Sequence, residues 1–353
     1  MLDFTSALFL DWRHAARDLP SWSALTTGRP AALEEPPGAT ALAARVALRT
    51  GAQDAVLHRS ALHALWDVVA VAAPPGTLVL VDGGAYAVTQ VAAAGALSRG
   101  RRVAVFRHHE PEDAARLARR ACGPTLVLTD GWCSSCSRPA PLAALSEAVR
   151  AVGRALVVVD DTLALGVLGS GPTRDRRFGH GGAGTAAWLG LPPPDVQVAS
   201  LAKAYGAPVA VTAGPRRLIA PLRQHGTRWH SSPSTAADLA AATIATADDV
   251  GNDRRRSRLE DLVARLRAGL RRLGCGVVGL PFPLVSATAP GRSSVSDLLA
   301  GLARADVLAV VRRPRCSPGP TLSFCVTSRH TEREIDRALG VLESCLGRRA
   351  AVS

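Results

Sequence analysis

The sequence predicts an α/β protein, with a mostly parallel sheet flanked by helices in a large domain and a small α+β domain after it. Between residues 38 and 215, short apolar segments alternate with Ala-rich segments that are long enough for helices. Such alternation requires crossover connections between parallel strands, with helices covering both faces of the sheet. After residue 215, a long arginine-rich amphipathic segment precedes shorter strand-like segments. We therefore expect an N-terminal segment at 1–37, a large domain at 38–225, and a small C-terminal domain with its connecting helix at 226–353.

Each strand of the large domain is predicted from a short run that is rich in β-branched residues and bounded by Gly, Pro or Asp. These runs are TLVLVD (77–82), RRVAVF (101–106), TLVLTD (125–130), RALVVVDD (154–161), VQVASLAK (196–203) and PVAVTAGP (208–215). Helices are predicted between them at 61–71, 85–97, 111–121 and 141–152. In the small domain we predict helices at 252–273, 293–305 and 332–346, and strands at 276–278, 284–287, 307–311 and 322–327.

The overall charge favours some partners and argues against others. The formal net charge of +13 is spread over short arginine runs and favours a phosphorylated cofactor, a CoA thioester, an acidic carrier protein or nucleic acid. Only 4% of residues are aromatic and no helix-turn-helix pattern is visible, which argues against nucleic acid. The N-terminus lacks a basic region ahead of an apolar one, and no apolar run is long enough to span a bilayer. We expect a cytoplasmic protein with no membrane partner.

The seven cysteines include one CxxC pair, Cys133 and Cys136. No second pair and no pair of histidines follows at the spacing of a zinc motif. We therefore expect small, semi-buried thiols in a reducing cytoplasm rather than a redox or metal site, and we predict no metal. His108 and His109 follow a predicted strand and are expected to lie in a loop.

A single lysine, Lys203, stands among the 42 Lys and Arg residues of the chain. Arginine supplies charge everywhere else, but a guanidinium cannot lose its proton and attack a carbonyl, whereas a desolvated lysine can. Asp82, Asp130, Asp160 and Lys203 all follow predicted strands, and ligands of open α/β sheets bind at the carboxyl ends of strands. This placement favours a Schiff-base role for Lys203 over that of a surface cation.

Lys203 and Asp160 together meet the main requirements of pyridoxal 5'-phosphate (PLP). The lysine binds the cofactor aldehyde, and the carboxylate pairs with the pyridinium nitrogen so that the ring can accept electrons. The phosphate needs hydroxyl groups and backbone N–H groups at a helix N-terminus. Ser60, at the start of a predicted helix, and Ser200, three residues before the lysine, supply this chemistry.

Seven segments, in order along nearly the whole chain, resemble motifs of the α-oxoamine synthase branch (8-amino-7-oxononanoate synthase-like) of the fold-type I, class I/II aminotransferase-like PLP-dependent enzymes. This resemblance implies the fold-type I architecture, PLP as the cofactor and a homodimer. The segments are LDFTSALFLDW (2–12), RTGAQDAVLHRSALHAL (49–65), LVDGGAYAV (80–88), VLTDGWCSSCSRPAPL (127–142), VVVDDTLALGVLGSG (157–171), ASLAKAYGAP (199–208) and TLSFCVTSRHTEREID (321–336).

The resemblance assigns catalytic roles to three residues. Lys203 would bind the cofactor and move the α-proton, Asp160 would hold the pyridinium nitrogen, and Tyr86 would stack on the ring in place of the family's histidine. Ser134 matches a serine near the ring oxygen.

The resemblance also implies a phosphate site. Ser200 and the N–H groups of Ala61 and Leu62 would bind the phosphate, with Ser60 nearby. Ser231 could reach the phosphate of a neighbouring subunit, because the family's sites lie at a dimer interface.

Two departures from the family pattern concern contacts with the cofactor and the substrate. Leu163 stands where the family has a histidine that supports the ring oxygen. Ser323 stands where it has the arginine that grips the substrate α-carboxylate, and losing such a clamp removes charge-assisted hydrogen bonds. Arg312, Arg313 and Arg315, on the preceding strand, are the candidates to replace it.

Three functions remain open on this evidence. The first is a transferase that condenses an amino acid with an acyl thioester of CoA or a carrier protein. The second is a diverged PLP enzyme of specialised metabolism: a transaminase, an aldolase-type enzyme or one that forms C–C bonds through β,γ-chemistry. The third is a non-catalytic PLP-binding or nucleic-acid-binding regulator. A requirement for a thioester separates the first two.

Overall fold

The computed structural model describes residues 1–20, 28–291, 293–313, 315–316 and 319–350. Its main sheet has seven strands in the order β2–β10–β9–β8–β5–β3–β4. Neighbouring strands are parallel except for β10, which is antiparallel to both β2 and β9. The predicted mostly parallel sheet is confirmed. The strands are β2 (Asp54–His58), β3 (Leu78–Asp82), β4 (Arg102–Phe106), β5 (Thr125–Asp130), β8 (Ala155–Asp160), β9 (Val196–Ser200) and β10 (Ala210–Gly214).

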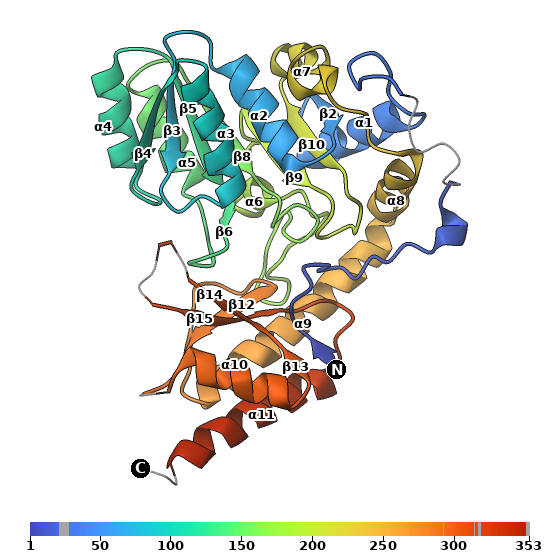
Figure 1. The fold of residues 1–353 in the computed structure, drawn as a ribbon, viewed down its shortest axis with the longest axis vertical. Helices are drawn as coiled ribbons and strands as arrows, with labels where there is room; N and C mark the ends of the chain where they lie inside the picture. Colours follow the sequence, from blue (N-terminus) through green and yellow to red (C-terminus); the bar gives the residue numbers. More distant parts are fainter. Residues whose placement is uncertain (21–27, 292, 314, 317–318, 351–353) are drawn as a thin grey trace.

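Helices cover both faces of this sheet (Figure 1). Along β3, Val79 and Val81 join one apolar core, whereas Leu78 and Leu80 join another. This alternation explains the uninterrupted apolar runs of the sequence, because side chains of successive strand residues point to opposite faces. The helices of this part are α1 (Ala39–Thr50), α2 (Ala61–Ala72), α3 (Ala87–Ser98), α4 (Pro111–Ala121), α5 (Leu142–Arg150), α6 (Thr185–Trp188), α7 (Arg216–Arg223) and α8 (Ala236–Ala247).

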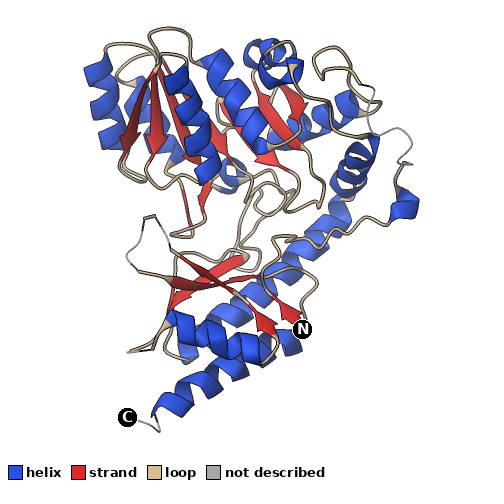
Figure 2. Ribbon diagram, viewed as in Figure 1, coloured by secondary structure: helices blue, strands red, loops and turns tan. Residues whose placement is uncertain are grey.

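A four-stranded antiparallel sheet lies below the main sheet in the view of Figure 2, with helices against it. The 24-residue helix α9 (Asp249–Arg272) runs from the main sheet to this small sheet. The small sheet comprises β11 (Gly276–Val277), β12 (Leu284–Thr288), β15 (Thr321–Cys325) and β14 (Val310–Arg312), with α10 (Val295–Arg304) and α11 (Glu332–Ala350) beside it.

The N-terminal residues join the small sheet region rather than the main sheet. Strand β1 (Leu2–Asp3) pairs in parallel with β13 (Val307–Leu308). The N–H of Cys325 then donates to the carbonyl of Phe4 at 2.7 Å. Residues 21–27 of the predicted 1–37 segment lie outside the described residues.

The structure differs from the predicted elements in three respects. Strand β9 ends at Ser200 rather than at Lys203, because the next residues form a helical turn in which the Tyr205 N–H donates to the Leu201 carbonyl at 3.1 Å. The predicted strand at 307–311 is divided into β13, which pairs with β1, and β14, which pairs with β15. The unpredicted elements include helices α1, α6, α7 and α8 and strands β1 and β2. No helix of the described residues combines the length and apolar character that crossing a membrane requires.

Candidate active site

A cavity of about 420 Å³ lies between the main sheet and the small sheet. Asp130, Asp160 and Ser200, the last residues of β5, β8 and β9, contribute to its lining. Arg312 of β14 and Ser323 of β15 line it from the small sheet. The cavity therefore lies at the carboxyl ends of parallel strands, where ligands of such sheets bind.

Lys203 lies in the turn after β9 and lines this cavity. Its Nζ lies 5.8 Å from the centre of the Tyr86 ring. Burial lowers the pKa of the Lys203 amine, while the negative charge of Asp160 opposes this shift. A lowered pKa makes a neutral, nucleophilic amine more accessible near neutral pH than it is for an exposed lysine.

Asp160 and Asp130 are register partners on the adjacent parallel strands β8 and β5. Asp160 accepts the N–H of Thr162 at 3.0 Å, and no ion pair to it occurs among the described residues. Asp130 accepts the N–H of Tyr86 at 2.9 Å and the hydroxyl of Thr89 at 3.3 Å. Burial raises the pKa of both carboxyl groups, and the charge of Asp160 raises the pKa of Asp130 further.

The sequence placed Asp130 at a strand end but gave it no role in the site. Its position in the lining, opposite Asp160 in the register, makes it part of the same polar group. The signal that could have identified it was present, because Asp130 ends a strand in the same way as Asp160 does.

The N-terminus of α2 reaches the cavity through Ala61. The first bond of this helix runs from the Ala64 N–H to the Ser60 carbonyl at 3.0 Å, so the amides of Ala61 and Leu62 precede it. Ser60 is the N-cap, and its Oγ accepts the N–H of His63 at 3.4 Å. The side chains of Ser60 and Leu62 are not part of the cavity lining.

Ser200 and Thr162 connect the ends of β9 and β8 at the cavity. The N–H of Ser200 donates to the Thr162 hydroxyl at 3.0 Å, and the Ser200 Oγ accepts the N–H of Ala202 at 3.3 Å. Both residues line the cavity. The bonds hold the segment that leads into Lys203 against the strand that ends at Asp160.

Arg312 is the arginine that the structure places in the cavity among the three candidates. Its guanidinium donates to Ser134, at 2.7 Å to the carbonyl oxygen and at 2.9 Å to Oγ. Arg313 is exposed, and Arg315 lies 3.5 Å from the carbonyl of Ala85. Ser323 is buried, and its Oγ lies 2.7 Å from that of Ser286.

The remaining predicted residues are distributed between this cavity and other places. Tyr86 and Ser134 line the cavity, as does Leu163, which presents an apolar side chain there. Ser231 lines a separate, smaller cavity with His58 and Arg228, and its hydroxyl donates to the Thr227 carbonyl at 2.8 Å. Its proposed contact with a neighbouring subunit stays a prediction.

The donors and acceptors of the cavity fit PLP. The buried Asp160 carboxyl needs a cationic partner, which a pyridinium N–H provides. The Lys203 amine suits an aldehyde, and the amides at the start of α2 suit a phosphate. Tyr86 presents an aromatic face, since its ring lies close to the Lys203 amine.

Comparison with known proteins gives consistent results. The model of the aminotransferase class I and II family matches residues 2–342. The 8-amino-7-oxononanoate synthase of Stutzerimonas stutzeri (strain A1501) is 30% identical over 323 residues, which are 90% of this chain and 73% of that protein.

Two solved structures share the fold. The serine palmitoyltransferase of Sphingomonas wittichii superposes with a TM-score of 0.84 at 19% identity, covering 99% of this chain and 88% of that one. A structure of SPT with the PLP internal aldimine has the same TM-score and coverage at 18% identity. The match over nearly the full length, the fold and the residues of the cavity lead to one conclusion: the chain belongs to the aminotransferase class I and II family.

Proposed function

We propose that this protein is a PLP-dependent transferase that forms a carbon–carbon bond by condensing an amino acid with an acyl thioester of CoA or a carrier protein. The observation that carries the proposal is the presence of the Lys203 amine and the Asp160 carboxyl group in one cavity, Asp160 at the end of β8 and Lys203 in the turn after the adjacent strand β9. The names of the relatives, 8-amino-7-oxononanoate synthase and serine palmitoyltransferase, support the choice of reaction.

When bound, PLP supplies an electron sink for negative charge that develops at the amino-acid Cα. Asp160 would hold the pyridinium nitrogen and keep it protonated. Lys203 would bind the cofactor and, once released from it, would remove and return a proton at Cα. The lowered pKa of its amine suits this role, because a general base works best when its pKa lies near the working pH.

The phosphate would bind at the start of α2. The amides of Ala61 and Leu62 point from a helix N-terminus, where the helix dipole favours an anion. Ser200 would add its hydroxyl from the end of β9. We propose that the enzyme is a homodimer in which Ser231 contributes to the partner's phosphate site, which sedimentation of the purified protein would test.

Arg312 would bind the α-carboxylate of the amino acid. It comes from β14, whereas the family's arginine position on β15 holds the buried Ser323. Val310 and Arg312 alternate along β14 so that both line the cavity. The substrate would then take over hydrogen bonds that Arg312 makes to Ser134 in the absence of ligand.

The second candidate is a transaminase or aldolase-type enzyme on the same scaffold. Two observations favour it: Leu163 lines the cavity where the family has a histidine, and Ser323 stands at the family's arginine position while the arginine in the cavity, Arg312, comes from another strand. Both changes alter how an amino acid is oriented before a bond at Cα breaks.

The cofactor is tested by incubating the purified protein with PLP and recording visible absorbance before and after borohydride reduction. We expect a band that reduction abolishes and one modified peptide, which contains Lys203. Lys203→Arg should keep its circular dichroism spectrum and lose both signals. A protein that gives no band and no modified peptide at saturating PLP would contradict the proposal.

The reaction is tested by assaying release of free thiol from a series of acyl-CoA thioesters in the presence of each amino acid. Thiol release that depends on both reactants supports condensation. Formation of an oxo acid without any thioester supports the transaminase instead.

A further inference from the structure

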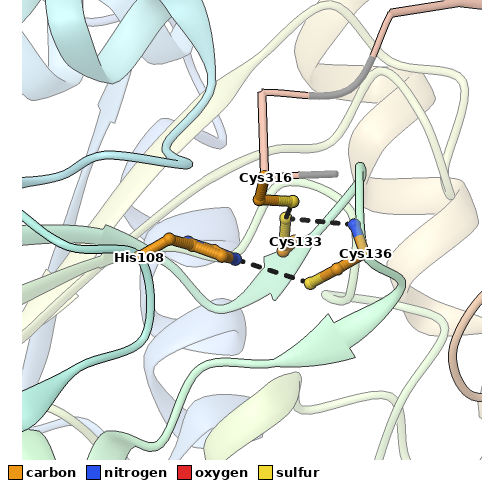
Figure 3. A group of neighbouring side chains, drawn as sticks. All are labelled: His108, Cys133, Cys136 and Cys316. Atoms are coloured by element: carbon orange, nitrogen blue, oxygen red, sulfur yellow. Dashed lines mark hydrogen bonds between the residues drawn. The ribbon is translucent and has the colours of Figure 1, made fainter. Parts of the chain in front are cut away.

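Four potential metal ligands lie close together (Figure 3), and the sequence neighbours of one of them, Cys133, line the active-site cavity. They are the Nε2 atom of His108 and the Sγ atoms of Cys133, Cys136 and Cys316, all within 4.8 Å of one another. His108 lies between β4 and α4, Cys133 and Cys136 belong to the hairpin of β6 (Trp132–Cys133) and β7 (Arg138–Pro139), and Cys316 follows β14. The cluster therefore joins three segments that are distant in the sequence.

Two distances within the cluster match those of a tetrahedral zinc site. Zinc binds sulfur at about 2.3 Å and imidazole nitrogen at about 2.0–2.1 Å, so a tetrahedron places two sulfurs about 3.8 Å apart and a sulfur and a nitrogen about 3.6 Å apart. The Sγ atoms of Cys133 and Cys316 lie 3.8 Å apart. The Nε2 atom of His108 lies 3.4 Å from Sγ of Cys136.

His108 is oriented as a metal ligand by the far side of its ring. Its Nδ1 lies 2.5 Å from Oδ1 of Asp82, which leaves Nε2 directed at the sulfurs. Asp82 is itself held by the N–H of Gly84 at 2.8 Å and the hydroxyl of Thr129 at 3.2 Å. A carboxylate behind a histidine in this way fixes the ring and strengthens the metal bond.

The backbone supports negative charge on the sulfur of Cys133. The N–H groups of Ser135 and Cys136 point at this sulfur, at 3.4 Å and 3.5 Å. Such donors favour a thiolate, the form of cysteine that binds a metal. Cys133 is also buried, so its charge needs compensation, which a divalent cation provides.

We propose that His108, Cys133, Cys136 and Cys316 form a structural zinc site. Three thiols and one imidazole are a ligand set that zinc prefers, and four protein ligands leave no open position for catalysis. A disulfide would use two of the sulfurs and leave the third sulfur and the oriented histidine without a role. The expectation of semi-buried thiols without metal overlooked His108 and Cys316, which the fold brings to the CxxC pair.

The zinc would fasten the segment after β14 to the β6–β7 hairpin. Arg312 and Ser134, which contact each other at the cavity, lie on these same two segments. The metal would thereby hold the small sheet region in place over the PLP cavity. This inference does not rest on the proposed function, because none of its ligands lines the cavity.

The test is the metal content of protein purified in a non-thiol reductant from zinc-supplemented cultures, after dialysis against EDTA. We expect about one zinc per chain in the wild type and in Cys122→Ser, an exposed cysteine outside the cluster. Cys316→Ser and His108→Gln should retain several-fold less zinc. Equal zinc in Cys316→Ser and Cys122→Ser, or a wild type without zinc, would overturn the proposal.

A second measurement covers variants that fail to fold. Cobalt added to metal-free wild-type protein should give the thiolate charge-transfer and strong visible bands of a tetrahedral sulfur site. Absence of these bands, or a Cys133–Cys316 disulfide found by mass spectrometry of protein prepared with the reductant, would equally rule the site out.

Discussion

Arg312 donates two hydrogen bonds to Ser134, one to its carbonyl oxygen at 2.7 Å and one to its Oγ at 2.9 Å. Through them a strand of the small sheet contacts the hairpin that follows β5 of the main sheet. The guanidinium is held in the cavity by these bonds, and no carboxylate pairs with it among the described residues. An anion that enters the cavity therefore finds a cation already in position.

Replacing Arg312 should weaken binding of the amino acid. In Arg312→Gln, we expect the dissociation constant of the amino acid, measured by spectral titration of the PLP-loaded protein, to rise about tenfold to hundredfold, since a hydrogen bond to a charged group contributes about 1.5–3 kcal/mol. The exposed Arg313 serves as the control, and Arg313→Gln should bind as the wild type does. An unchanged constant in Arg312→Gln would assign carboxylate binding to another residue.

The single lysine allows its pKa to be measured directly. Burial lowers the pKa of Lys203 from 10.5, and Asp160 acts in the opposite direction. In the cofactor-free protein, the rate of amine modification at Lys203, followed by peptide mapping across pH, should therefore give an apparent pKa below 10.5. Asp160→Asn removes the negative charge that stabilises the protonated amine, so it should lower the apparent pKa of Lys203 further.

The matched control for this measurement is Asp336→Asn, which removes a carboxylate that is paired with Arg265 on the surface. It should leave the modification profile of Lys203 unchanged. A higher apparent pKa in Asp160→Asn than in the wild type would show that Asp160 does not stabilise the charged amine.

The sequence predicted the part of the site that depends on strand ends. The apolar pattern located both strands, although β8 ends at Asp160, one residue before its predicted end, and β9 ends at Ser200, three residues before its predicted end. Their convergence follows from the parallel arrangement, which places the carboxyl ends of neighbouring strands at one edge. Lys203 was predicted from its chemistry, because no other residue of the chain carries a primary amine in a side chain.

The rest depends on contacts between distant segments. Nothing local distinguishes Arg312 from Arg313 and Arg315; the pairing of β14 with β15 decides which of them lines the cavity. Cys316 and His108 likewise reach Cys133 only through the folded chain. Helix α8 is a different case. Thr235 and Asp238 form a capping box, and this pair of residue types three positions apart can be recognised in the sequence, but our prediction did not use it.

Asp130 should make the cofactor-free protein less stable as pH rises. Its folded-state pKa is raised by burial and by Asp160, so the folded state binds this proton more tightly than the unfolded state does. The contribution of Asp130 to the free energy of unfolding is therefore greatest below its ordinary pKa of 3.8, and it decreases as pH rises towards the folded-state pKa. Asp130→Asn removes this loss, so its free energy of unfolding should exceed that of the wild type at pH 7 but not near pH 4.

Asp54→Asn provides a control of opposite sign. Asp54 accepts two hydrogen bonds from Arg223, at 2.8 Å and 2.7 Å, and its pKa is lowered. Its contribution to the free energy of unfolding is present above the ordinary pKa of 3.8 and is lost as pH falls through the lowered pKa of the folded protein. Denaturant titrations from pH 2 to pH 8 should show Asp54→Asn close to the wild type at the acidic end, falling below it as pH rises to the ordinary pKa of 3.8, and staying below it by a constant amount above that pH. A difference between Asp130→Asn and the wild type that does not change with pH would refute the linkage.

The neighbouring acid, Asp161, should have a structural effect of its own. It is buried and accepts the N–H of Thr185 at 2.9 Å, the hydroxyl of Thr185 at 2.6 Å and Nε2 of Gln197 at 2.7 Å. Asp161→Ala leaves the N–H and the hydroxyl of Thr185 without this acceptor, each at a cost of about 1–3 kcal/mol, whereas Nε2 of Gln197 keeps the Ala183 carbonyl at 3.2 Å. With two donors affected, we expect the free energy of unfolding to fall by about 2–5 kcal/mol.

The Asp161 prediction is checked by urea denaturation beside Asp175→Ala, an exposed acid that should change stability by less than about 0.5 kcal/mol. Because Asp161 follows Asp160 directly, its network fixes the end of β8 and with it the Asp160 carboxyl group. Asp161→Asn keeps one acceptor oxygen and should recover part of the lost stability. If Asp161→Ala unfolds at the same urea concentration as the wild type, the network does not stabilise this end of the sheet.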